Sequence, residues 1–188
     1  MATSSSYQKQ AYRNIYDYNN IYDGKTMDVF LNDIKKEILI GIRGTASLKD
    51  VITDLNFITN TLSSTSRYIM DKNKLEEIIK IYNPNEYSYF ITGHSLGGGL
   101  SAQFMRDFPF IKESIVYNSA TQPIDILNQN PNITYFYVDK DPLYSLSGHF
   151  IKNKEVIPYK SGLNGKMGLI TPTFLQAHKL NQFDRLYE

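Results

Sequence analysis

The residues Gly93-His94-Ser95-Leu96-Gly97 place a hydroxyl side chain between two glycines, directly after the strand-forming run EYSYFIT. This G-x-S-x-G spacing is typical of a nucleophilic serine on a sharp turn between a strand and a helix. Small residues are needed on both sides, because larger side chains would clash at so tight a bend. The helix that follows points unpaired N–H groups at the place where negative charge develops in acyl transfer. The pattern therefore predicts Ser95 as a nucleophile.

A phosphate-binding loop is the alternative function for so many glycines. Such loops follow a strand and have the patterns G-x-G-x-x-G or G-x-x-x-x-G-K-[ST]. Here the spacing from Gly93 is G-x-x-x-G-G-G, and no lysine stands behind the glycines. The acidic residue expected at the end of the next strand is also missing, because Glu113 lies at the start of that strand. The nucleophilic serine is therefore favoured.

A serine hydroxyl needs a base to take its proton, and the base needs a carboxylate that holds its tautomer. On this type of turn the chain order is serine, acid, histidine. The chain has 3 histidines. We interpret His94 as structural, because its side chain leaves the turn in another direction than that of Ser95. His149 and His178 remain as candidate bases.

Two carboxylates, Asp139 and Asp141, follow the strand-like run ITYFYV, and a strand end can aim an acid at the nucleophile. Pro142 stiffens the loop after Asp141. Only a short loop joins Asp141 to His149, whereas His178 has a whole segment with which to return over the serine. Spacing therefore favours Asp141 and His178. Asp139 and His149 remain as alternatives, and each could instead be an ordinary surface residue.

Hydrophobic periodicity predicts the elements that position these residues. Strands are expected at MDVFL and EILIGI, as a hairpin, and at EYSYFIT, ESIVYN and ITYFYVD. Helices are expected at SLKDVITDLNF, DKNKLEEIIKIY, LGGGLSAQFMRDF and TFLQAHKLNQFDRLY. The pattern also favours a short helix in KQAYRNIYDYNNIY, one helical turn in TQPIDILNQNPN and a hairpin in HFIKNKEVIPY. Strands that alternate with helices indicate an α/β fold, with a mostly parallel sheet covered by helices on both faces.

Composition excludes several other classes of function. The 188 residues, of which 41% are hydrophobic, fit one domain spanning 1–188. A net charge of +1 without a basic stripe argues against nucleic acid as a partner. The absence of cysteine excludes thiolate metal sites and a catalytic thiol. Neither a secretory signal nor an apolar run long enough to cross a membrane is visible, so we expect a cytoplasmic or virus-encoded protein.

Several segments, in the same order, resemble the class 3 lipase family, the fungal-type triacylglycerol lipases with an α/β-hydrolase fold. GIRGTASLKDVITDL resembles the F-R-G-[ST] strand end of that family, and YFITGHSLGGGLSAQ resembles its nucleophile turn, G-H-S-L-G-G-A. DKDPLYSLSGHF resembles the D-P-V segment, and AHKLNQF resembles the late D-H-x-x-x-Y segment. The chain is shorter than is usual for the family. It also carries Gly99 where the family has alanine, at a cost of roughly 1 kcal/mol in helix propensity.

The resemblance implies a compact α/β-hydrolase fold with Ser95 as nucleophile, Asp141 as acid and His178 as base. It implies an oxyanion hole formed by Thr45 and by the N–H of Leu96. The expected function is hydrolysis of lipid esters, of the triacylglycerol lipase, esterase or phospholipase A1 type, in lipid degradation. No metal or organic cofactor is implied, and the expected partners are a lipid or small ester and, transiently, a lipid surface.

Residues 46–58 follow Thr45 and are amphipathic, so they form either a mobile lid, as in the fungal relatives, or a helix packed on the sheet. Two other functions stay open beside ester hydrolysis. One is a catalytically silent domain that binds an apolar ligand or partner. The other is an acyltransferase or thioesterase on the same fold.

Overall fold

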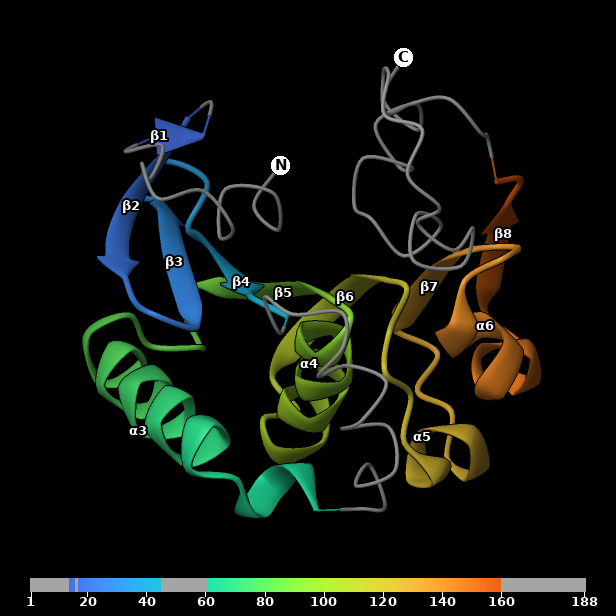
Figure 1. Cartoon of the computed structure of the whole chain (residues 1–188). Coiled ribbons are helices and arrows are strands. Elements are labelled where there is room, and N and C mark those ends of the chain that lie inside the picture. The colour runs from blue at the N-terminus through green and yellow to red at the C-terminus, as the bar shows by residue number, and fades with distance from the viewer. Residues whose placement is uncertain (1–13, 16, 45–60, 160–188) are drawn as a thin grey trace, which may run out of the picture.

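The computed structural model describes residues 14–15, 17–44 and 61–159, which share one twisted sheet (Figure 1). Its 8 strands lie side by side in chain order. The first three pairings, from β1 to β4, are antiparallel, and every pairing from β4 to β8 is parallel. The strands are β1 (Asn14–Ile15), β2 (Tyr18–Asp23), β3 (Met27–Asn32), β4 (Glu37–Ile42), β5 (Ser88–His94), β6 (Ile111–Tyr117), β7 (Ile133–Val138) and β8 (Lys154–Ile157).

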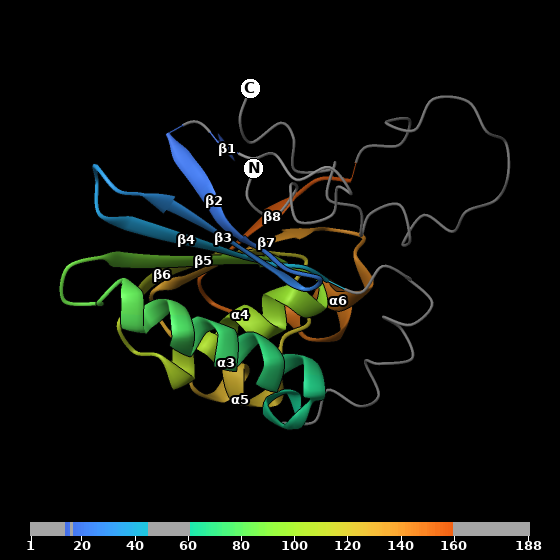
Figure 2. The same cartoon turned by 90° about the vertical axis from the view of Figure 1, so that its left-hand side faces the viewer.

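The described helices connect the parallel strands, and α3, α4 and α5 lie on the same face of the sheet (Figure 2). The helical elements are η2 (Leu62–Ser64), α3 (Ser66–Ile81), α4 (Leu96–Asp107), α5 (Pro123–Leu127), α6 (Pro142–Leu146) and η3 (Gly148–Phe150). None of the helices within the described ranges is long and apolar enough to cross a membrane. The α/β fold with a mostly parallel sheet is therefore confirmed. Helices on the second face, and a single domain over 1–188, stay predictions.

The core lies between the sheet and helices α3 and α4. Ile40 of β4 and Ile91 of β5 are almost fully buried. They form one hydrophobic cluster with side chains from both helices, Leu100 and Phe104 of α4 and Leu75 of α3. Burial of so many apolar side chains holds α4 firmly on the central strands. The start of α4 is consequently a fixed point at the carboxyl end of β5.

The first strands differ from the helix expected there. The residues 14–15 and 18–23 form β1 and β2, and β2 pairs with β3 in antiparallel register, for example Asn19 with Leu31. The predicted β3–β4 hairpin is confirmed, and its outer edge has backbone groups that need partners. Tyrosine and isoleucine favour strands, so pairing with this edge outweighs the weak helical spacing.

The expected hairpin at HFIKNKEVIPY is also wrong. Its first residues form η3, and β8 then runs parallel to β7, with Tyr137 opposite Val156. The chain returns through α6 and η3 before it enters the sheet, as a parallel connection requires. Helix α3 is confirmed but begins earlier than expected, because the Thr65 hydroxyl caps it by accepting a hydrogen bond from the Tyr68 N–H at 3.2 Å.

Candidate active site

Ser95 lies at the point where β5 ends and α4 begins, in a backbone conformation that side chains rarely adopt. Its φ is 58° and its ψ is −125°, and the residue is only 1% exposed. The backbone around it is tied on both sides. The Ser95 N–H donates to the Tyr117 carbonyl at 3.0 Å, and the Ser95 carbonyl accepts from the Ala120 N–H at 2.9 Å. Strain of this kind persists where the surroundings enforce it, and it is common at functional sites.

The two glycines of the motif are required by close approaches of the backbone. A methyl group on Gly93 would lie 2.2 Å from the Gly97 carbonyl oxygen, and one on Gly97 would lie 2.3 Å from the Ile42 carbonyl oxygen. The first residues of α4 therefore press against the end of β4. Gly99 has a similar reason, since its Cβ would lie 2.4 Å from the Ala120 carbonyl oxygen. The close packing at this position therefore requires glycine, and this requirement outweighs its lower helix propensity.

The Ser95 hydroxyl is not used by the helix that it begins. Serine is a preferred N-cap residue because its oxygen accepts a hydrogen bond from the first turn. Ser95 occupies the N-cap position of α4 without such a bond. Its Oγ is buried and has no hydrogen-bond partner among the residues that the structure describes. A buried hydroxyl without a partner costs free energy, and this one is placed where a nucleophile is expected.

The start of α4 supplies one side of the expected oxyanion hole. Leu96 is the first residue of α4, so its N–H has no acceptor inside the helix. The helix N-terminus also carries partial positive charge, which favours an oxyanion nearby. Thr45 lies outside the described residues, which reach Gly44 at the end of β4.

Asp141 is the buried one of the two candidate acids. It is 0% exposed and lies at the N-cap of α6, and its Oδ1 accepts hydrogen bonds from Leu143 N at 2.7 Å and Tyr144 N at 3.4 Å. Asp139, in contrast, is exposed, and its Oδ1 accepts from Tyr159 N at 2.8 Å. The fixed carboxylate of Asp141 can hold an imidazole in one orientation. The Asp139 carboxylate instead binds the backbone of the segment that follows β8.

The serine and this acid lie at the same edge of the sheet. Tyr117 at the end of β6 is paired with His94 of β5 and with Phe136 of β7. Neighbouring strands are about 4.8 Å apart, so the ends of β5 and β7 are separated by about 10 Å. That span suits an imidazole ring with one hydrogen bond to each side.

The structure describes two of the three histidines. His94 is 7% exposed, in β5, and the side chain is buried as a structural residue would be. His149 is exposed, in η3, with its ring centroid 3.8 Å from that of Phe150 and its Nδ1 3.3 Å from the Tyr144 carbonyl oxygen. His178 lies outside the described residues, as do the candidate lid 46–58 and the expected last helix. Ser95, Leu96 and Asp141 are thus brought to one edge, and the base and Thr45 stay predictions.

Sequence reasoning missed two residues that hold this edge together. Asn118, at φ 42°, accepts a hydrogen bond from Val138 N at 2.9 Å through its side chain, and donates its own N–H to the Phe136 carbonyl at 2.8 Å. These bonds join the ends of β6 and β7. Asparagine directly after a strand is a signal for such a left-handed residue. The Tyr137 hydroxyl lies 2.6 Å from Thr121 Oγ1, and burial, with a smaller contribution from Asp141, raises the pKa of Tyr137.

No family model and no curated protein matches the sequence. Among solved structures, lipase II from Rhizopus niveus is similar, with a TM-score of 0.52, 15% identity, and coverage of 79% of this chain and 72% of that one. A triacylglycerol lipase with a catalytic centre described as a serine protease triad is similar with a TM-score of 0.56, 18% identity, and coverage of 79% and 71%. Lip2 lipase from Yarrowia lipolytica is similar with a TM-score of 0.49, 19% identity, and coverage of 75% of this chain and 66% of that one.

These likenesses concern the fold, because the identities are low and the chain spans about two thirds of the length of Lip2. The resemblance to class 3 lipases is thereby confirmed at the level of structure: this chain has the α/β-hydrolase-like fold of the fungal lipases.

Proposed function

We propose that this protein is a serine hydrolase that cleaves carboxylic esters of lipids through an acyl-enzyme intermediate. One observation carries the proposal. The Ser95 hydroxyl is buried, without a partner in the described part of the chain, and lies at the strained start of α4 instead of capping it. Asp141, at the same edge of the sheet, supports a triad with His178 as the base.

The reaction has two halves. Ser95 Oγ attacks the ester carbonyl carbon while His178 takes the hydroxyl proton, and the carbonyl oxygen becomes an oxyanion that accepts hydrogen bonds from Leu96 N–H and Thr45. The C–O bond to the alcohol then breaks, and His178 returns the proton to the leaving oxygen. Water, deprotonated by His178, attacks the acyl carbon, and the fatty acid leaves as Ser95 regains its proton.

Asp141 orients the imidazole and stabilises its protonated form. Its backbone and side chain are both fixed, because Asp141 N–H donates to the Val138 carbonyl at 2.9 Å while Oδ1 caps α6. A carboxylate held in this way directs one oxygen to the helix and can turn the other toward a histidine. The acid therefore need not move during the reaction.

Acylglycerols are the substrate class that the solved lipases support, since one of them is described as a triacylglycerol lipase. Acylglycerols form aggregates in water, so the protein would meet its substrate at a lipid surface. Hydrolysis of a triglyceride series should then rise when the substrate exceeds its aggregation limit. A rate that follows the concentration of dissolved ester smoothly would favour a soluble-ester esterase instead.

The direct test is release of p-nitrophenol from short and long acyl esters by the wild type, Ser95→Ala and Ser114→Ala. Ser114 is a matched control, because its Oγ is also buried without a hydrogen-bond partner in the described residues, but it lies within β6. We expect Ser95→Ala to abolish turnover and Ser114→Ala to retain it.

Two results would contradict the proposal. Absence of turnover by the folded wild type on every ester, together with binding of fatty acids, would favour a silent domain that binds an apolar ligand. Transfer of the acyl group to added alcohols, or hydrolysis limited to thioesters, would favour the acyltransferase or thioesterase. Product analysis in the presence of alcohol acceptors distinguishes these enzymes.

A further inference from the structure

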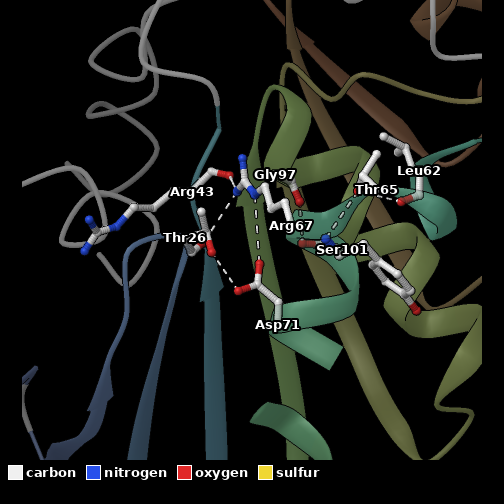
Figure 3. Close-up of polar contacts among 9 residues, drawn as sticks. Thr26, Arg43, Leu62, Thr65, Arg67, Asp71, Gly97 and Ser101 are labelled. Carbon is white, nitrogen blue, oxygen red and sulfur yellow. Dashed lines mark hydrogen bonds and ion pairs between the residues drawn. The ribbon is translucent and has the colours of Figure 1, made fainter. Parts of the chain in front are cut away.

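A cluster of polar side chains lies at the end of β4, beside the start of α4 (Figure 3). It joins Arg67 and Asp71 of α3 with Thr26, which precedes β3, and with the carbonyl of Arg43, which follows β4. None of these residues has a role in the reaction proposed above. The cluster is close to that reaction, because the Arg43 carbonyl lies against Gly97, in the first turn of the helix that begins after Ser95.

Arg67 binds the backbone of two strand ends at once. Its Nη2 donates to the Arg43 carbonyl, and it also lies 3.4 Å from the Thr26 carbonyl oxygen. These carbonyls belong to opposed chain segments, since the Arg43 N–H donates to the Thr26 carbonyl at 2.9 Å. One guanidinium therefore holds the last rung of the β3–β4 hairpin.

Asp71 is the ion-pair partner of the guanidinium. It lies one helical turn after Arg67, with Oδ2 3.9 Å from Arg67 Nε, while its Oδ1 accepts a hydrogen bond from Thr26 Oγ1 at 2.6 Å. The Asp71 side chain is 5% exposed and that of Arg67 is 19% exposed. Charges this far from water attract each other more strongly than surface charges do.

The opposite side of the Arg43 carbonyl faces α4. A Cβ on Gly97 would lie 2.6 Å from that oxygen, so no side chain separates the two segments. Ser101 in turn donates to the Gly97 carbonyl at 2.8 Å, which fixes the first turn of α4 (Figure 3). The Arg43–Gly44 peptide thus lies between the start of α4, with the Leu96 N–H, and the Arg67 guanidinium.

The position of Arg67 is unfavourable for the helix itself. It is the second residue of α3, where the partial positive charge of the helix N-terminus is unfavourable for a cation. No acidic residue in the first turn of α3 compensates for it. A cation at this place needs another reason, and its bonds to the Arg43 and Thr26 carbonyls provide one.

We propose that Arg67, paired with Asp71, is a positioning residue that holds the Arg43–Gly44 peptide against the start of α4, where the Leu96 N–H serves as a donor of the oxyanion hole. The inference rests on the proposed ester hydrolysis. Arg67 acts through the Arg43–Gly44 peptide and does not touch the substrate. Because the oxyanion exists only in the transition state, a change in this peptide lowers kcat and leaves KM nearly unchanged.

The test compares Arg67→Gln with Arg106→Gln. Arg106 is a matched control: it lies on a helix, its side chain is 27% exposed, and it pairs with the buried Asp125 at the end of α4 opposite to Ser95. We expect Arg67→Gln to lower kcat by about 10–100-fold, which is less than the loss of an oxyanion donor, with KM changed by less than about threefold. Arg106→Gln should change kcat by less than about twofold.

A second measurement separates positioning from general damage. A trifluoromethyl ketone adds to the serine and forms an oxyanion, so its affinity should fall by the same factor as kcat/KM in Arg67→Gln. Two milder variants should have kcat values between those of Arg67→Gln and the wild type. Arg67→Lys keeps the charge and one donor, and Asp71→Asn keeps the bond to Thr26. If Arg67→Gln does not fold, these two variants decide the question.

The proposal is overturned if the Arg67 and Asp71 variants keep the kcat of the wild type, or lose activity only in KM. It is also overturned if Arg106→Gln loses as much kcat as Arg67→Gln at the same thermal stability. Failure of the underlying function gives another result, namely a folded wild type without ester turnover, and that result removes both proposals. An active wild type with unaffected Arg67 variants removes only this one.

Discussion

Ser95 and Asp141 occupy the same place in two strand–helix units of the fold, β5–α4 and β7–α6, and use it in opposite ways. Each follows a parallel strand and is the N-cap of the next helix. Asp141 has an ordinary φ of −71°, and its carboxylate accepts two hydrogen bonds from the first turn of α6. Ser95 has a φ of 58°, and its hydroxyl makes no cap bond. The side chain of Asp141 stabilises its helix, whereas that of Ser95 is withheld from its helix.

The difference indicates what each residue needs for the proposed reaction. An acid that orients a base must stay fixed, and hydrogen bonds from helix N–H groups provide this condition. A nucleophile must stay accessible to a base and an ester carbon, so bonds to its own helix would hinder it. Substitutions at the two caps should therefore separate stability from activity.

The largest effect is expected for Asp141→Asn. Asparagine also caps helices well, so the free energy of unfolding should fall by less than about 1 kcal/mol, while kcat falls by about 10⁴-fold because the imidazole loses its correct tautomer. Asp141→Ala should lose activity similarly and a further ~1 kcal/mol of stability. Urea denaturation and ester kinetics measure the two effects. Equal stability of Asp141→Asn and Asp141→Ala would contradict the stabilisation of α6 by the Asp141 side chain.

Gly97→Ala should be the most destabilising of the small substitutions. The added methyl group would lie 2.3 Å from the Ile42 carbonyl oxygen, so α4 or β4 must move, at a cost of more than about 3 kcal/mol. Pro142→Ala is the matched change at the other corner, and we expect it to cost less than about 1 kcal/mol. Thermal denaturation of both variants tests this contrast. A Gly97→Ala variant as stable as the wild type would show that the turn between β5 and α4 can adjust to the added methyl group.

Asp28 is another buried carboxylate, without a helix N-terminus to stabilise it. It is 1% exposed, and both of its oxygens lie 3.3 Å from Arg43 Nη2, which is also 3.5 Å from Asp23. Burial raises the pKa of Asp28 to about 6, and Arg43 opposes that rise. The folded protein thus binds this proton more tightly than the unfolded chain, which stabilises the fold at low pH. The contribution is lost as the pH rises through about 6.

The prediction for Asp28 follows from this sign. Between pH 4 and pH 6.5, the free energy of unfolding of the wild type should fall relative to that of Asp28→Asn, by up to about 3 kcal/mol. Urea denaturation of both proteins across this range measures the difference. Parallel stability curves would mean that Arg43 keeps Asp28 ionised throughout. Asp28 would then resemble Asp141, a carboxylate that is satisfied by its surroundings.

At Ser95 itself, substitution should produce a modest gain in the free energy of unfolding. Ser95→Gly removes both the buried hydroxyl and the backbone strain at φ 58°, so it should stabilise the protein by about 1 kcal/mol or more. Ser95→Ala removes only the hydroxyl and should stabilise it less. Differential scanning calorimetry can resolve the order. Destabilisation by Ser95→Gly would show that the hydroxyl supports the fold after all.

The parts of the site that were predictable are those in which local pattern and geometry coincide. Gly93 and Gly97 flank Ser95 because the backbone leaves no room for a Cβ, so the physical constraint appears directly in the sequence. The sequence favours Asp141 over Asp139 because Pro142 stiffens the loop after it, and in the structure that proline begins α6 with Asp141 as the N-cap. Strands β5 to β7 and helix α4 followed from hydrophobic periodicity.

The parts that were missed depend on contacts between distant residues. Arg67 binds the carbonyl of Arg43, 24 positions away, and a backbone acceptor has no signature in the sequence. The strands β1 and β2 form because β3 has an edge to be paired, which the pattern of residues 14–23 does not reveal. The parallel direction of β8 likewise depends on its pairing with β7, a contact that the local sequence does not reveal.

The most direct test of the central claim is active-site labelling with a fluorophosphonate, which phosphonylates an activated serine and does not require the natural substrate. We predict one adduct per chain, located by peptide mass spectrometry on Ser95, and labelling of Ser114→Ala at the wild-type rate. Ser95→Ala should remain unlabelled. A folded wild type that takes up no label, or takes it up on another residue, would contradict the assignment of Ser95 as the nucleophile.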